Sequence, residues 1–348
     1  MSFVRLAPEQ HDTLEGIPEP SEAARLVGHA TAVAAIVEAY RSGRLHHALL
    51  LTGPKGIGKA TLAFQIARYL LANPDPAKAQ EGLPPTDPSD RVFRQIASGS
   101  HLSVLHVTRN YNDKTKKFMT ILGVDEVRRI GRFLSMTAHD GAFRVVIVDS
   151  ADDMNVNAAN ALLKRLEEPP EKTLFLLLSH SPGRLLPTIR SRCQMIRLAP
   201  LDETDMAEAL GATGATLSGA PSEILARAEG SVRRALLLSE FGGMEIVGAV
   251  DRLLGAPNLD TESLHRLAEA VAGRENEILF DLMNDHLLLR LSEASTDAAA
   301  QGAAERAGAL ARAWDEMLVA IRDAGTYNLD RKQHALTMIL KSHRTFRM

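Results

Sequence analysis

The sequence predicts an α/β domain with a parallel sheet covered by helices on both faces, followed by helices alone. Up to about residue 200, short apolar runs alternate with segments of helical periodicity, which is typical of a parallel sheet. From Asp202 onward the strand signal disappears, and alanine- and leucine-rich helical segments follow one another. We therefore expect an α/β domain over residues 1–200, a small helical lid over 201–243 and an all-α C-terminal domain over 244–348.

Five apolar runs are the expected strands. They are Ala48 to Leu51, Leu102 to Val107, Val145 to Val148, Leu174 to Leu178 and Met195 to Leu198. Helical spacing begins near Ala23, where we expect the first ordered unit, and returns at Val124 to Met136 and at Val156 to Leu166. Residues Pro74 to Asp90 contain five prolines and predict an irregular insertion.

Composition limits the class of protein. A hydrophobic fraction of 45% and a charged fraction of 24% indicate an ordinary globular chain, and the net charge of -3 gives no overall attraction to nucleic acid. The single cysteine, Cys193, excludes an intramolecular disulfide and favours a reducing compartment, so we expect the cytoplasm. The first fifteen residues resemble neither a secretory signal nor a transit peptide. No stretch approaches the roughly 20 apolar residues of a membrane helix, so no membrane partner is expected.

A glycine-rich segment follows the first expected strand and opens a helix. Its residues are Gly53, Pro54, Lys55, Gly56, Ile57, Gly58 and Lys59. This G-x-x-x-x-G-K spacing between strand and helix predicts a P-loop, in which backbone N–H groups and the lysine ammonium bind the phosphates of ATP.

The residues after this lysine predict poor magnesium binding. Ala60 stands where a Ser or Thr hydroxyl ordinarily ligates the ion. Thr61 lies one residue further, which turns its side chain by about 100° around the helix. We therefore expect backbone amides and Lys59 to carry any nucleotide binding, with magnesium-dependent hydrolysis impaired.

Asp149 ends the apolar strand Val145 to Val148, which is the pattern of a carboxylate that holds magnesium through water at the carboxyl edge of a sheet. Asp152 and Asp153 follow on the next turn, where we expect a helix N-cap and a solvated face.

The segment from Asn160 to Pro170, with the sequence NALLKRLEEPP, predicts an amphipathic helix ended by two prolines. The expected buried stripe is Val156, Ala159, Leu163 and Leu166. This segment resembles the signature of the AAA+ clamp-loader subunits of bacterial DNA polymerase III. Ser191-Arg192-Cys193 is similar to the S-R-C motif of the same family, and the resemblance covers about Ala23 to Leu238.

The resemblance implies roles for particular residues. Arg192 is implied as the arginine finger that enters the ATP site of a neighbouring subunit; the alternative is an ordinary surface arginine, and Arg190 and Arg197 are nearby decoys outside the motif position. Ser179 matches the sensor 1 position and Arg233 the sensor 2 position. The adenine-contacting region is implied at Val27 and Gly28.

Ala60 and Ser150 depart from the pattern of the family's active ATPases, and the resemblance then implies a stator-like subunit. Active AAA+ enzymes carry a Glu after the acidic strand end, whereas this chain has Ser150, so general-base assistance worth about 10²- to 10⁴-fold is missing. The cysteines of the family's zinc module are also missing, so no zinc is expected. The resemblance then implies a weak or absent ATPase, in a subunit that is part of a DNA-directed DNA polymerase holoenzyme without being its catalyst.

The partners implied are the gamma/tau and delta subunits, joined in a hetero-pentamer through a collar of C-terminal helices. The sliding clamp is implied indirectly, and primed DNA through sequence-independent backbone contacts. Trp314 and Tyr327 are expected in the helical core, with an interface as the alternative.

Two other functions stay open. The retained Gly58, Lys59 and Asp149 suit an active gamma-type clamp-loader ATPase. A different AAA+ remodelling ATPase is the third possibility, and the segment from Leu162 to Pro170 and the S-R-C motif argue against it.

Overall fold

The computed structural model describes residues 5–135, 143–273 and 276–348. By its internal contacts the chain divides into two compact units. One is Met1–Thr216 with Leu225–Ala235, and the other is Leu217–Ile224 with Leu236–Met348. The division into three domains at residues 200 and 243 stays a prediction.

Five strands form the sheet of the first unit, in the order β2-β5-β6-β1-β7. In chain order they are β1 (Ala48–Thr52), β2 (Val104–Val107), β5 (Arg144–Val148), β6 (Thr173–Ser179) and β7 (Gln194–Arg197). Each overlaps an apolar run of the sequence, and every pairing is parallel, which confirms the predicted α/β sheet. The carboxyl ends of all five strands therefore meet at one edge, and their amino ends at the other.

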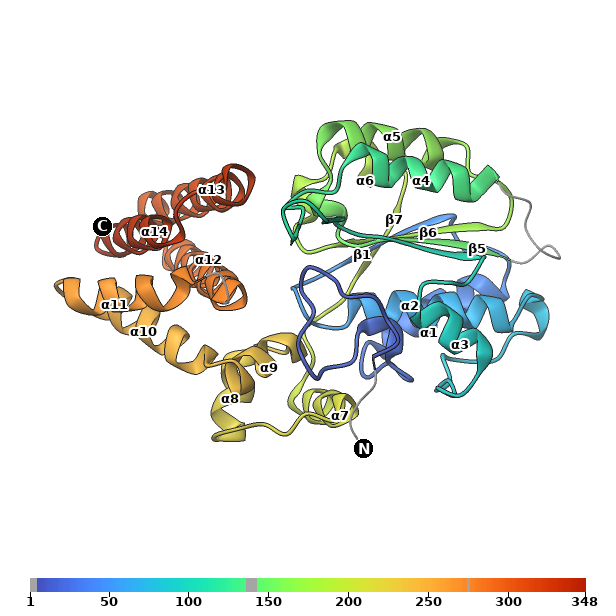
Figure 1. Ribbon diagram of the computed structural model, residues 1–348, viewed down its shortest axis with the longest axis horizontal. Helices are drawn as coiled ribbons and strands as arrows, with labels where there is room; N and C mark the ends of the chain where they lie inside the picture. The colour runs from blue at the N-terminus through green and yellow to red at the C-terminus, as the bar shows by residue number, and fades with distance from the viewer. Residues whose placement is uncertain (1–4, 136–142, 274–275) are drawn as a thin grey trace. The chain divides into compact units, whose positions relative to one another are not determined.

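Helices cover both faces of this sheet (Figure 1). One face carries α1 (Ala30–Arg41), α2 (Lys59–Ala72) and α3 (Arg91–Ala97), and the other carries α4 (Val124–Ser135), α5 (Val156–Glu167) and α6 (Pro187–Arg190). Within β1, Leu49 and Leu51 pack into the first core and Ala48 and Leu50 into the second, as the period of two in a strand requires. The predicted extension of α4 to Met136 lies outside the described residues.

The buried side of α5 differs from the predicted stripe. Its fully buried side chains are Ala158, Ala159, Leu162 and Leu166. Val156 is 66% exposed, and Leu163 is only partly buried. The reason lies at the start of the helix, where Asn155 caps the amide of Ala158 and leaves Val156 on the outer side of the first turn.

Ordered structure begins earlier than the sequence predicted. Residues 5–22 fold into a loop with buried Leu14 and end in the 3-10 helix η1 (Pro20–Glu22). The guanidinium of Arg68 on α2 donates hydrogen bonds to the carbonyl oxygens of Ser21 and Ala23. The expectation of a start near Ala23 was wrong because backbone hydrogen bonds to side chains, rather than apolar periodicity, hold this loop.

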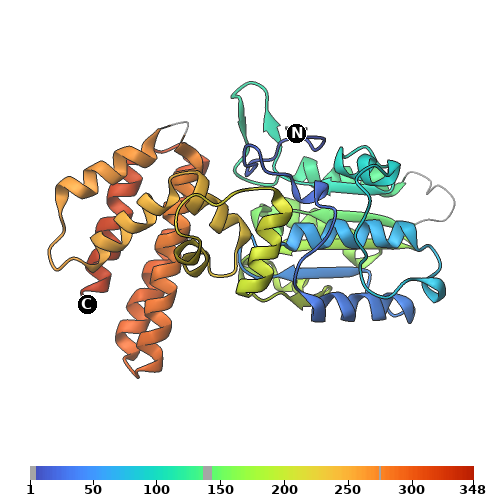
Figure 2. The same ribbon diagram turned by 90° about the horizontal axis from the view of Figure 1, so that it is seen from below.

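Two further connections complete the first unit. The proline-rich insertion is irregular, as predicted, apart from the 3-10 helix η2 (Pro76–Lys78). The antiparallel hairpin of β3 (Tyr111–Asn112) and β4 (Lys117–Phe118), which was not predicted from the sequence, stands out from the central sheet in Figure 2.

The rest of the chain is helical, as predicted. Its helices are α7 (Glu203–Thr213), α8 (Pro221–Ala228), α9 (Val232–Glu240), α10 (Gly243–Gly255), α11 (Thr261–Ala272), α12 (Glu277–Ala300), α13 (Ala304–Tyr327) and α14 (Arg331–Phe346). The last five surround one core, in which α12 and α13 pack along each other. Trp314 is partly buried against this core, whereas Tyr327 is 70% exposed at the end of α13, so a core position for Tyr327 was wrong. Across the described ranges, none of the helices has both the length and the apolarity to cross a bilayer.

Candidate functional site: a phosphate loop and a distant arginine

The glycine-rich segment connects β1 to α2 at the carboxyl edge of the sheet. A side chain at Gly53 would place its Cβ 2.5 Å from the carbonyl oxygen of Leu198, and one at Gly56 would place it 2.4 Å from the hydroxyl of Ser231. Both residues also have positive φ angles, of 149° and 77°. Only glycine fits this path. The loop is therefore closed against β7 on one side and against the start of α9 on the other.

Lys59 is the first residue of α2 and is 4% exposed. Its ammonium folds back over the loop and donates hydrogen bonds to the carbonyl oxygens of Gly53, at 2.8 Å, and Pro54. Burial lowers the pKa of Lys59 to about 8, although the carboxylates of Asp149 and Asp152 act in the opposite direction. A buried ammonium whose hydrogen-bond acceptors are neutral carbonyl oxygens is stabilised further by an anion. The position of Lys59 therefore suits a phosphate group.

Asp149 follows β5 at the same edge and is half-buried. Its Oδ2 lies 3.8 Å from Nε2 of His106 on the neighbouring strand β2. Ser150 is 4% exposed, and its hydroxyl accepts a hydrogen bond from the amide of Asp152. Ala60 brings no oxygen to the site, so among the predicted magnesium groups only Asp149 offers one, and these residues do not fit a complete magnesium site.

Asp152 has a different position from the one predicted. Its carboxylate accepts hydrogen bonds from the hydroxyl of Ser179 at 2.8 Å and from the amides of His180 and Ser181. Asp153 forms a bidentate ion pair with Arg109, with both N···O distances at 2.8 Å. The expectation of an N-cap and a solvated face was wrong, because the 3-10 helix η4 (Ala151–Asp153) turns both carboxylates toward neighbouring strand ends.

The sensor 1 candidate is thus fixed by Asp152. Ser179 is fully buried at the end of β6, with its hydroxyl committed to that carboxylate. The next residue, His180, has a buried Nδ1 with no hydrogen-bond partner among the described residues. Burial, with the charges of Lys59 and Lys55, holds the pKa of His180 well below its usual value. This strand end therefore presents a neutral imidazole beside the two loop lysines.

The sensor 2 candidate lies in the first turn of α9. Arg233 donates a hydrogen bond to the carbonyl oxygen of Asp12 and lies 3.5 Å from its carboxylate. Ser231 donates to the carbonyl oxygen of Lys55 at 2.9 Å, and the amide of Arg233 to that of Gly56 at 3.4 Å. Asp12 was not predicted as a site residue, because no periodic pattern or motif marks it.

The adenine-region candidates lie just before α1. Gly28 has a φ of 73°, and a Cβ there would lie 2.6 Å from Leu201 and 2.7 Å from Asp205 on α7. Val27 beside it is half-buried. The next residue, His29, contacts the carbonyl oxygen of Ile57 through Nε2 at 2.7 Å, which joins this segment to the P-loop.

The arginine-finger candidate lies far from all of these groups. Arg192 sits in the turn between α6 and β7, where the amino ends of the strands meet. Its Nη2 lies 2.9 Å from Oε1 of Glu167, and its Nη1 donates to the carbonyl oxygen of Thr188 at 3.1 Å. The five residues of β1 alone separate the two edges by about 13 Å at ~3.3 Å per residue. The structure therefore brings the loop, Asp149, Ser179 and Arg233 together and leaves Arg192 at the opposite edge.

The phosphate-binding groups form one cluster. Lys55, Lys59, Arg233 and the N-terminus of α2 supply positive potential, and His180 supplies an unpartnered ring nitrogen. This set fits the phosphates of a nucleotide. Among the described residues, no group of three or more His, Cys, Asp or Glu side chains could hold a metal ion.

Comparison with known proteins identifies the family. The model described as DNA polymerase III, delta subunit, matches residues 28–202, which is half of the chain. The delta-prime subunit of DNA polymerase III from Pseudomonas aeruginosa is 42% identical over 147 residues, covering 42% of this chain and 41% of the relative. The Escherichia coli delta-prime subunit is 38% identical over 168 residues, covering 48% and 47%. The match thus spans less than half the length of each of these relatives.

Other matches are more distant. The tau subunit of DNA polymerase III from Escherichia coli is 29% identical over 278 residues, covering 76% of this chain and 40% of the relative. Among solved structures, a gamma subunit-related protein from Thermotoga maritima covers 91% of this chain and 99% of its own, at 19% identity and a TM-score of 0.39. The family model leads to one conclusion, which the identities to the delta-prime relatives support: this chain belongs to the family described as DNA polymerase III, delta subunit, and is similar to delta-prime subunits.

Proposed function

We propose that this chain is a stator-like, delta-prime-type subunit of the bacterial clamp loader, which supplies Arg192 to the ATP site of a neighbouring subunit. The supporting observation is the position of Arg192 at the amino edge of the sheet, away from the P-loop of its own chain. A guanidinium in that position can contact a nucleotide only if the nucleotide is bound to another polypeptide. Such an arginine is permanently charged, and as a finger it is worth about 10³- to 10⁵-fold in rate.

The chain's own pocket supports a weak or absent ATPase. Lys59 and the amides of the loop are the groups that would hold phosphates, while the positions of the magnesium hydroxyl and the general base carry Ala60 and Ser150. Bound ATP would supply the triphosphate that these donors recognise. On this proposal the chain contributes to clamp loading by holding its neighbours in place and by contacting a neighbour's ATP. Other chains of the polymerase holoenzyme carry out hydrolysis and DNA synthesis.

The partners proposed are the gamma/tau and delta subunits of a cytoplasmic hetero-pentamer. The delta-prime and tau names of the relatives support this assembly. The C-terminal helices α10 to α14 are the proposed collar, the sliding clamp is engaged indirectly, and primed DNA is contacted through its backbone.

The test is the ATPase of the reconstituted complex in the presence of primed DNA and clamp. Arg192→Ala is expected to lower the rate by about tenfold or more while the complex still elutes intact in gel filtration. Arg197→Ala removes an exposed arginine five positions away and is expected to leave the rate unchanged. An unchanged rate with Arg192→Ala would show that this arginine is not the finger.

A second candidate function is an active gamma-type ATPase, favoured by the retained Lys59 and Asp149 at one edge of the sheet. Rapid magnesium-dependent hydrolysis by the isolated chain would replace the stator proposal with this one.

A further inference from the structure

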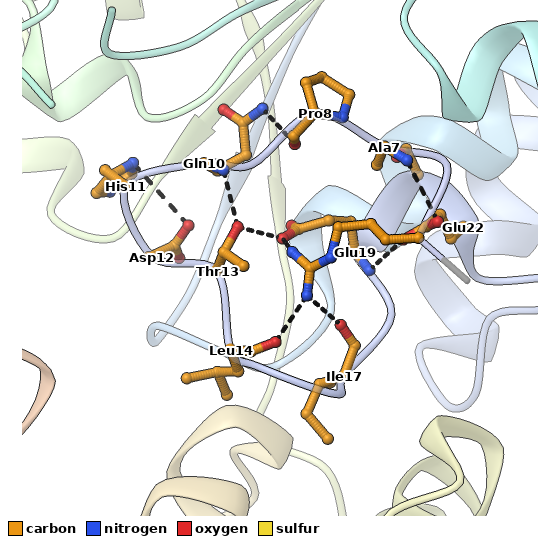
Figure 3. A network of polar contacts seen from close by, with 12 residues as sticks. Ala7, Pro8, Gln10, His11, Asp12, Thr13, Leu14, Ile17, Glu19 and Glu22 are labelled. Carbon is orange, nitrogen blue, oxygen red and sulfur yellow. Dashed lines mark hydrogen bonds and ion pairs between the residues drawn. The ribbon is translucent and has the colours of Figure 1, made fainter. Parts of the chain in front are cut away.

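The loop of residues 7–14, called the strap below, has a fixed shape (Figure 3). Glu19 lies at its centre and accepts hydrogen bonds from Arg5, at 2.9 Å, and from the hydroxyl of Thr13. Arg5 also donates to the carbonyl oxygens of Leu14 and Ile17. The strap is therefore an ordered element rather than a trailing end.

The strap carries a carboxylate to the phosphate-binding cluster. Asp12 pairs with Arg233 on α9, with Nη1 3.5 Å from Oδ2. Burial alone would raise the pKa of Asp12, but Arg233, followed by His11, Lys55 and His180, lowers it to about 2. Asp12 is thus an anion that interacts with Lys55 of the P-loop, His180 after β6 and Arg233 of α9.

Gln10 and His11, which precede Asp12 in the strap, lie close to groups that follow strands β2 and β5. The side-chain oxygen of Gln10 accepts a hydrogen bond of 2.7 Å from the hydroxyl of Thr108, just after β2. Burial lowers the pKa of His11, and the charges around it are those of Asp12, Arg109, Asp153 and Asp149. Residues 10–12 therefore lie across the region where nucleotide phosphates and Asp149 would meet.

We propose that the strap is an intramolecular plug of the nucleotide pocket, in which the Asp12 carboxylate takes the place on Arg233 and Lys55 of a terminal phosphate of a nucleoside triphosphate. Carboxylate and phosphate oxygens compete for the same cationic donors, and guanidinium binds both. Nucleotide then enters only when the strap leaves. The plug concerns this chain's own pocket and is independent of the role of Arg192 toward a neighbour.

The proposal fixes how affinity responds to the strap. The apparent Kd of a ligand that needs the open form is its intrinsic Kd divided by the open fraction. Weakening the Asp12 contact enlarges that fraction, so Asp12→Asn is expected to tighten ATP binding by about two- to tenfold, the range of a partly exposed ion pair. The measurement is isothermal titration of the full chain with ATP in the presence of EDTA. Glu15→Gln, an exposed residue beside the strap, makes the same charge change away from the pocket and is expected to match the wild type.

Hydrogen exchange gives a second readout on the wild type. The amide of Gln10 bonds the hydroxyl of Thr13 at 2.8 Å, and the amide of Thr13 bonds the carbonyl oxygen of Gln10 at 3.2 Å. Saturating ATP is expected to speed exchange at these two amides and to slow it in the P-loop. Equal affinity of wild type and Asp12→Asn, no ATP binding by either, or P-loop protection with an unchanged strap would each overturn the proposal. The Arg192 test uses the assembled ATPase, so the failure of one leaves the other standing.

Discussion

Arg192 and Glu167 form an ion pair of 2.9 Å that joins two motifs lying 25 positions apart, the end of α5 and the S-R-C turn. The side chains are 36% and 48% exposed. Pairs of this kind contribute only ~0.2–1 kcal/mol, so Arg192 can exchange Glu167 for a phosphate at little cost. In the role proposed for Arg192, this pair would keep the guanidinium in place without preventing it from binding a neighbour's phosphate.

Replacing Glu167 tests this description. In Glu167→Gln the competing carboxylate is lost, while the carbonyl oxygen of Thr188 still accepts from Arg192. We expect the KM for ATP of the reconstituted loader to fall by about two- to fivefold with kcat unchanged. Glu168→Gln, next in sequence and exposed, is the control. A loss of kcat as large as that of Arg192→Ala would mean that Glu167 orients the arginine for catalysis.

Asp152 is predicted to stabilise the first unit. Asp152→Ala leaves the buried hydroxyl of Ser179 and the amide of His180 without their acceptor. Each such loss costs about 1–3 kcal/mol, so urea unfolding should show a decrease of that order in the free energy of unfolding. Asp113→Ala, at an exposed site of the β3–β4 hairpin, should change it by less than about 0.5 kcal/mol. Equal effects of both substitutions would remove the structural role of Asp152.

Lys59 makes stability depend on alkaline pH. Its pKa is about 8 in the folded chain, against 10.5 for an unperturbed lysine, so between these pH values the unfolded chain binds more protons. The free energy of unfolding should therefore rise with pH across this window, by up to ~3 kcal/mol, relative to a Lys59→Met variant. Chemical denaturation at pH 7.5 and 10 measures the difference. Parallel pH profiles for the two proteins would contradict the burial of a charged ammonium.

Restoring the missing hydroxyl should restore magnesium dependence alone. In Ala60→Ser the hydroxyl returns to the expected ligand position, and we predict that magnesium then tightens ATP binding without a gain in hydrolysis, because position 150 still lacks a carboxylate. Titration with ATP in the presence and absence of magnesium measures the change in affinity. A phosphate-release assay measures hydrolysis. Thr61→Ala should leave both unchanged, and a loss of binding there would show that Thr61 reaches the metal.

The sequence predicted the sheet and the loop because their signals are local. Apolar runs located all five strands to within two residues at each end, since buried parallel strands must be apolar on both faces. The position of Asp152 was mispredicted because its partner, Ser179, is 27 positions away and no period links them. The same holds for the strap, where Glu19 gathers groups from residues 5–19 through polar contacts that leave no hydrophobic pattern.

The opposed placement of Lys59 and Arg192 gives the molecule a direction. In the proposed role of Arg192, the chain would accept phosphates at one edge of its sheet and offer an arginine at the other, an arrangement that suits head-to-tail association. In such a head-to-tail assembly, the arginine of each subunit faces the P-loop of the next subunit. A subunit with an impaired nucleotide site would then be tolerated best at the end of the assembly, where its arginine faces a neighbour and no neighbour's arginine faces its own P-loop. On that proposal, the positions of Lys59 after β1 and of Arg192 before β7 would decide which place in the assembly this chain takes.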